Sequence, residues 1–184
     1  MGTKEKQQIS NQGLVSNSPV KKAGGYHAAL FRLSADLEAV IKEEDVYRCV
    51  VEGLHDTLGY DFVAFFRHDS KTGYRDLVAS AGFAEPVTPL APGEGLSERP
   101  LLDGKLHYSP DVSKEPGYFY GADGSEVDVP IWGKDEVIGV LTCERREVNA
   151  FNKQDFEVLK SAAQIAGLAI EKARLFAQVE KQAG

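Results

Sequence analysis

Residues 125–144 read SEVDVPIWGKDEVIGVLTCE, and this stretch decides the fold. Val127, Val129 and Ile131 alternate with more polar residues, which is the period of a β-strand with one apolar face and one more polar face. A glycine-bearing turn leads into a second strand at 136–144. Two strands joined by a short turn predict a mostly antiparallel sheet at the centre of the fold.

A long helix follows the second strand and is expected at about 152–182. Asn152 can accept a hydrogen bond from the backbone N–H of Asp155, whose carboxylate can reach back to the start of the helix, as in a capping box. Apolar side chains then recur in alternating steps of three and four, and the alanines among them would allow a second helix to approach closely. This heptad pattern predicts a homodimer interface made of Leu159, Ala162, Ala166, Ala169, Ala173 and Phe176.

The sequence before residue 125 predicts two helices, a hairpin and a loop region. Helical spacing of apolar residues indicates helices at 30–41 and 46–58, and Gly59 is placed to end the second one. Apolar and aromatic runs separated by a short polar turn indicate a hairpin of strands at 61–69 and 74–81.

Between the hairpin and residue 125 the sequence has many prolines and glycines that interrupt regular secondary structure. A short helix is expected to begin near Leu96, a short strand at 106–109, and the segment 110–124 reads as a loop. Residues 1–25 are polar and cannot bury enough apolar surface to offset their ordering entropy, so they predict a flexible tail. Residues 26–184 then form one domain.

The composition excludes several classes of protein. The chain has 184 residues, 42% of them hydrophobic, which suits one globular domain. Its net charge of −7 and its dispersed basic residues argue against nucleic-acid binding. The two cysteines, Cys49 and Cys143, are too few for a disulfide framework or a zinc ribbon. No run approaches the ~20 apolar residues of a membrane span, and no signal peptide is visible, so a cytoplasmic location is expected.

Over residues 28–178 the sequence resembles the GAF domain family. The resemblance rests on the strand ending Val-Pro-Ile at 129–131, the strand VIGVL at 137–141, the helix start Phe151-Asn152-x-x-Asp155 and the alanine-rich helix that ends in Ala-Arg-Leu. It implies an α/β (α+β) fold. The N- and C-terminal helices would cover one face of the sheet, and a ligand pocket roofed by the 110–124 loop would lie on the other.

Residues 116–123, PGYFYGAD, are similar to the roofing loop of the cyclic-nucleotide-binding branch. That similarity implies a ligand site made of Tyr118, Phe119, Tyr120, Asp123, Gly95 and Ser97. The aromatic rings would stack on a purine, Asp123 would accept its N–H, and the glycine-rich backbone and helix start near Gly95 would meet a phosphate. The same branch has an ion pair between a basic residue at the end of a strand and an aspartate on the last helix. The equivalent pair in this sequence is expected to be Arg146–Asp155.

Other branches of the family fit less well. The free methionine-R-sulfoxide reductases use cysteines in the roofing loop, whereas residues 106–126 contain none. The bilin-binding branch uses a Cys-His pair, which is absent from this sequence. We therefore expect a non-catalytic, bacterial-type sensory domain, with no cofactor identified, that binds a small ligand and signals through a helical dimer to an output domain or partner protein. Two alternatives stay open: a structural dimerisation module with a collapsed pocket, and a sensor of small anions or metabolites.

Overall fold

The computed structural model describes residues 23–82, 88–118 and 123–184. The tail expected over 1–25 lies almost wholly outside these ranges, and the first helix, α1 (Ala23–Glu38), begins three residues before the expected start of the domain. Within the described residues no helix is both long and apolar enough to cross a membrane.

The centre of the molecule is a five-stranded antiparallel sheet. Its order is β2-β1-β5-β4-β3, so β5 lies in the middle and the short β3 at one edge. The strands are β1 (Phe62–His68), β2 (Arg75–Gly82), β3 (His107–Ser109), β4 (Ser125–Trp132) and β5 (Val137–Arg145). Each lies within one or two residues of its expected position, because period-two alternation and turn residues mark strand limits directly in sequence.

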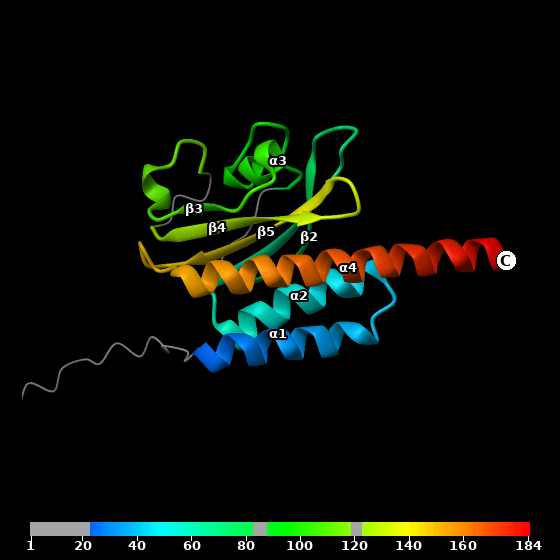
Figure 1. Ribbon diagram of the computed structural model, residues 1–184. Helices are drawn as coiled ribbons and strands as arrows, with labels where there is room; N and C mark the ends of the chain where they lie inside the picture. The colour runs from blue at the N-terminus through cyan, green and yellow to red at the C-terminus, as the bar shows by residue number, and fades with distance from the viewer. Residues whose placement is uncertain (1–22, 83–87, 119–122) are drawn as a thin grey trace, which may run out of the picture.

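Three helices cover one face of the sheet (Figure 1). Helix α2 (Glu43–Leu58) packs on β1 and β2, the long α4 (Lys153–Ala183) packs on β4, and α1 lies outside both. As expected, α2 ends at Gly59, whose φ of 68° is in the left-handed region that favours glycine. The opposite face carries a 3₁₀ turn (Leu96–Glu98) and the short α3 (Arg99–Asp103). The predicted GAF-like arrangement of layers is confirmed.

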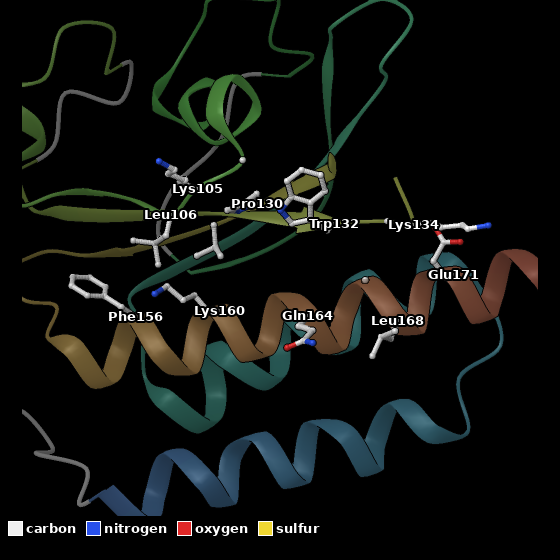
Figure 2. Close-up of a pocket in the computed structure, with 14 residues that line it drawn as sticks. Lys105, Leu106, Pro130, Trp132, Lys134, Phe156, Lys160, Gln164, Leu168 and Glu171 are labelled. Atoms are coloured by element: carbon white, nitrogen blue, oxygen red, sulfur yellow. The ribbon is translucent and has the colours of Figure 1, made fainter. Parts of the chain in front are cut away.

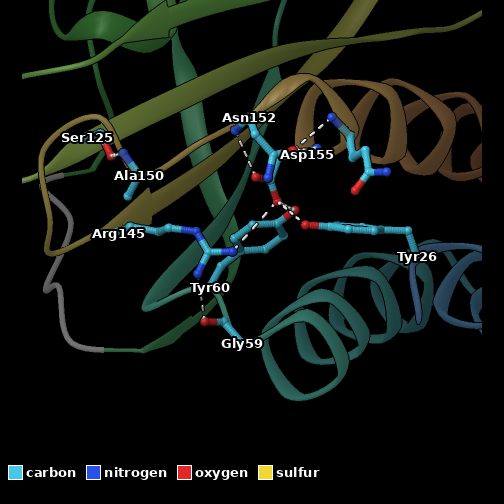
Figure 3. Close-up of polar contacts among 9 residues, drawn as sticks. Tyr26, Gly59, Tyr60, Ser125, Arg145, Ala150, Asn152 and Asp155 are labelled. Carbon is cyan, nitrogen blue, oxygen red and sulfur yellow. Dashed lines mark hydrogen bonds and ion pairs between the residues drawn. The ribbon is translucent and has the colours of Figure 1, made fainter. Parts of the chain in front are cut away.

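The start of α4 is fixed by a polar cluster around Asp155 (Figure 3). Asn152 and Asp155 form the expected capping box. The Asp155 carboxylate also accepts hydrogen bonds from the hydroxyls of Tyr60 (2.9 Å) and Tyr26 (3.2 Å). Its cationic partner is Arg145, at 3.6 Å, and not Arg146 as expected. Arg145 extends over the Tyr60 ring, whereas the backbone N–H of Arg146 donates to Asp61.

The alanine-rich side of α4 packs inside its own domain. The dimer interface predicted there was wrong for five of its six residues, because their side chains are buried in the domain's own hydrophobic core, where a second chain cannot reach them. These five are Leu159, Ala162, Ala166, Ala169 and Ala173. Only Phe176 is exposed. The alanines do allow close helix packing, but the surfaces that approach are the sheet, α1 and α2.

Candidate functional site

The face of the sheet that points away from the three long helices carries buried carboxylates. Glu126 and Asp128 lie on β4, and Glu144 lies on the adjacent β5; each side chain belongs to a residue at most 3% exposed. The alternation in residues 126–131 therefore has the expected period. Its more polar side faces the interior and not solvent.

Strand register brings these carboxylates together. Glu126 lies directly opposite Glu144, and Asp128 lies directly opposite Thr142, whose hydroxyl donates a 2.6 Å hydrogen bond to it. Residues directly opposite on antiparallel strands have Cβ atoms about 5 Å apart, and like charges in such a pair destabilise the sheet. The cluster therefore concentrates negative charge where water is scarce.

Hydrogen bonding leaves part of this charge unsatisfied. The Tyr118 hydroxyl donates to Oε2 of Glu144 at 3.2 Å. The other oxygen, Oε1, is buried and has no hydrogen-bond partner among the described residues. Because a buried ionised oxygen without a donor is costly, this atom marks a place where a donor or a proton would stabilise the fold.

Burial and mutual repulsion make the cluster retain protons. Burial raises the pKa of Glu126 well above its usual range, and the charges of Asp128 and Glu144 raise it further. Burial, followed by the charge of Asp128, raises the pKa of Glu144 to about 7. The pKa of Asp128 is also raised by burial, against the opposing effect of its hydrogen bonds. At neutral pH the three groups therefore share protons, and a cation would compete for the same site.

A small cavity opens beside these groups. It has a volume of about 20 Å³, room for about one water molecule. Its wall is largely apolar, from two phenylalanines of β1 and two leucines of the facing segments, with Glu126 and Thr142 as the polar floor. The lining residues are Phe62, Phe66, Leu90, Gly95, Leu96, Ser97, Tyr118, Glu126 and Thr142.

A buried arginine fixes the far wall of the cavity. Arg75, at the start of β2, is fully buried, donates to the Ser97 hydroxyl at 2.5 Å and pairs with Glu98 at 3.0 Å. It also donates to the backbone carbonyls of Ala91 and Glu94. These contacts hold the 91–98 segment against the sheet, so Gly95 and Ser97 face the carboxylates.

The predicted ligand residues fall into three groups. Gly95, Ser97 and Tyr118 line the cavity. Asp123 is exposed, and it is not among the residues that line the cavity. Phe119 and Tyr120 lie outside the described residues.

Sequence reasoning did not assign Glu126, Asp128 or Glu144 to the site. The sequence does contain three acidic residues at alternate positions of two neighbouring strands. Their closeness in space is apparent only from the strand register, which pairs Glu126 with Glu144.

Neither of the chain's two cysteines belongs to the cavity. Cys143 points to the opposite side of β5 and is buried in the core between sheet and helices; burial raises the pKa of its thiol well above the usual range. Cys49 lies on α2, and burial likewise raises the pKa of its thiol. Among the described residues no group of three or more His, Cys, Asp or Glu side chains could hold a metal ion.

The family model of the GAF domain matches residues 41–171. The chain is similar to free methionine-R-sulfoxide reductase from Neisseria meningitidis, with 21% identity and a TM-score of 0.79 over 86% of this chain and 95% of that one. A GAF domain of a phosphoenolpyruvate-protein phosphotransferase from Coxiella burnetii matches with 21% identity and a TM-score of 0.76, covering 86% and 99%. A putative GAF sensor protein from Burkholderia vietnamiensis matches with 18% identity and a TM-score of 0.73, covering 86% and 99%. No curated protein matches the chain.

Proposed function

Because the chain belongs to the GAF domain family, whose members bind small molecules, we propose that it is a non-catalytic sensor of a small molecule that carries a protonated amino group. The ligand's amino group would lie against Glu126, Asp128 and Glu144, and its remainder would pack on Phe62 and Phe66. Binding would be passed on through the helices on the other side of the sheet.

The observation that carries this proposal is the buried carboxylate cluster, in which Oε1 of Glu144 has no hydrogen-bond partner within residues 23–82, 88–118 and 123–184. Negative charge on these three acidic groups is not offset when they lose their protons, because the buried Arg75 is paired with Glu98 and Arg99 is paired with Glu115. A protonated amine has three N–H donors and one positive charge, so it would satisfy both the charge and the missing hydrogen bond. Larger ligands need Tyr118 to leave Glu144, since the present cavity is small.

The carboxylate cluster disfavours two anionic ligand classes expected from the sequence, cyclic nucleotides and small inorganic anions. A cyclic nucleotide would bring its phosphate beside three carboxyl groups, and the two arginines that act on this cluster, Arg75 and Arg99, already pair with Glu98 and Glu115. A small inorganic anion would meet the same surroundings. Tyr118 at the wall could stack on a purine, so cyclic nucleotides remain the second candidate to be tested. The reductase in the comparison acts on free methionine sulfoxide, an amino acid, which supports a ligand of the amino-acid class. The cysteines do not favour reductase chemistry, because neither lines the cavity and the pKa values of both thiols are raised.

The signalling surface would be the exposed stripe of α4. Leu168, Leu175 and Val179 are each at least 60% exposed, and with Ile165 and Lys172 they follow alternating steps of three and four. Phe31 of α1 is 79% exposed and belongs to the same side, since it shares a surface hollow with Leu168. We expect a homodimer through this stripe. Leu175→Glu should then sediment as a monomer with an unchanged circular dichroism spectrum, and a wild-type monomer at high micromolar concentration would overturn the dimer.

The ligand class is tested by calorimetry at pH 8, with free methionine, putrescine, cyclic AMP, cyclic GMP and inorganic phosphate as probes. We expect at least one of the two amines to bind, and binding to weaken at least tenfold at pH 5.5, where protons occupy the carboxylates. Glu144→Gln should weaken the amine at least tenfold, whereas Glu157→Gln, an exposed change on α4, should leave it unchanged. Binding of a cyclic nucleotide or phosphate with no response to either amine would overturn the amine and support an anion sensor. No binding by any of the five probes would support the collapsed-pocket alternative.

A further inference from the structure

A second and larger hollow lies on the helix side of the sheet. It is a groove of about 950 Å³ between α4 and the edge formed by β4 and the 104–106 segment (Figure 2). It shares no residue with the cavity above the carboxylates. Its apolar surface comes from Leu106, Val129, Pro130, Trp132, Phe156 and Leu168.

The groove exists because β3 is short. β3 pairs only with residues 126–128 of β4, so the rest of β4 has no further strand beside it. α4 approaches closely at this point, since a Cβ added to Gly167 would lie 2.3 Å from the carbonyl oxygen of Trp132. Helix and strand thus meet along a backbone contact that forms the floor, and the side chains on either side form the walls.

The groove is elongated and its charge is at one end. It follows α4 from Phe156 to Glu171, which is about 22 Å along a helix. Lys105 and Lys160 lie at the end with Phe156, whereas Lys134 lies beside Glu171 at the other end (Figure 2). The ion pair of Lys160 with Glu157 is solvent-exposed and therefore weak. Among the residues that line the groove, one end thus has two lysines and no carboxylate, the other end has one lysine and one glutamate, and the middle is apolar.

We propose that this groove binds a free fatty acid with an unbranched alkyl tail. The carboxylate would lie between Lys105 and Lys160, and the alkyl tail would extend over Pro130 and Trp132. A single anionic head at one end, followed by an apolar tail, fits this distribution of lysines and apolar side chains. The volume is within the range of pockets that hold small molecules.

Trp132 provides the readout. It is the protein's only tryptophan, it lines the groove, and it is half exposed. An alkyl tail that covers its ring will therefore shift its fluorescence to shorter wavelength. The probe is dodecanoate, titrated below its micelle concentration into wild-type protein. The matched probes with the same tail are dodecanol, which is neutral, and dodecylammonium, which is cationic. We expect saturable binding of one dodecanoate per chain, at least tenfold tighter than dodecylammonium.

Two surface variants test the head-group contact. Lys105→Glu with Lys160→Glu should weaken dodecanoate at least tenfold, whereas Lys181→Glu, on the same helix beyond the groove, should not. All three positions are exposed, so circular dichroism should show folded proteins. Equal binding of the anionic and cationic probes, or dodecanoate binding that survives the double change, would overturn the proposal. An acidic amphipathic peptide that shifts Trp132 fluorescence where dodecanoate does not would also overturn it, and would make the groove a protein-docking site.

Discussion

Asp155 and Glu144 are both nearly fully buried carboxylates, and they lie on opposite sides of the same sheet. Asp155 accepts hydrogen bonds from two tyrosine hydroxyls and from the Asn152 backbone, and it pairs with Arg145. Glu144 accepts one hydrogen bond from Tyr118, keeps one oxygen unpartnered among the described residues, and faces Glu126 across the strands.

The difference separates two uses of a buried charge. A carboxylate that is surrounded by donors ties together the elements that supply them, here α1, the start of β1, the end of β5 and the start of α4. A carboxylate with too few donors adds nothing to the fold when it is ionised, since its desolvation is not offset. Burial alone therefore does not distinguish these two environments, and the count of hydrogen-bond donors does.

The largest effect should come from Asp155→Ala. It leaves Arg145 without its anion and two tyrosine hydroxyls without their acceptor, so the free energy of unfolding should fall by about 3 kcal/mol or more. Urea denaturation at pH 7 measures the change. Glu157→Ala, two residues along the same helix but exposed, is the control and should change stability by less than about 0.5 kcal/mol. A small loss for Asp155→Ala would mean that its donors are satisfied equally well by water.

The pH dependence of stability tests the environment of Glu144. The folded-state pKa of Glu144, about 7, lies above the unfolded value near 4.5, so the folded chain binds more protons in this window. Stability of the ligand-free protein should therefore fall as pH rises from 4.5 to 7, by on the order of 1–3 kcal/mol. Glu144→Gln should reduce this fall and be more stable than wild type at pH 8. Denaturation at pH 5 and pH 8 decides the matter, and a wild-type protein that gains stability over this range would show the cluster to be well satisfied.

The smallest effect compares two tyrosines. Tyr60→Phe removes a donor from Asp155 in a buried site and should cost about 1 kcal/mol. Tyr118→Phe removes the donor to Glu144, a partly protonated group at neutral pH, and should cost less than half as much. Thermal melts of the two variants beside wild type give the comparison. Equal losses would remove the distinction between the two carboxylate environments.

Local patterns were sufficient to predict most of the fold. The hairpins, the left-handed Gly59 and the capping box at Asn152 depend on spacings of a few residues, and the structure confirms each of them. Local patterns did not indicate which surface the alanine-rich side of α4 packs against. A heptad pattern of alanines can pack on a sheet of the same chain as well as on a helix of a second chain.

The carboxylate cluster needed information that single segments do not hold. Glu126 and Glu144 are 18 positions apart and meet only through the register of β4 and β5. The role of Arg75 likewise depends on contacts between residues 16 and 22 positions apart, from the start of β2 to the 91–98 segment. The spacing of aromatic residues near Tyr118 identified the wall of the cavity, but it did not indicate the charge beneath.

Under the proposed signalling function, the end of the long α4 would act as a lever. The helix begins at a clamped end, where Asp155 holds Arg145, and Arg145 directly follows Glu144 in β5. Its buried side chains continue to Ala173, so α4 moves with the core up to that residue. The ten residues from 174 to 183 form an arm of about 15 Å that extends past the body of the domain (Figure 1). A tilt of about 15° of this arm would move its far end by about 4 Å.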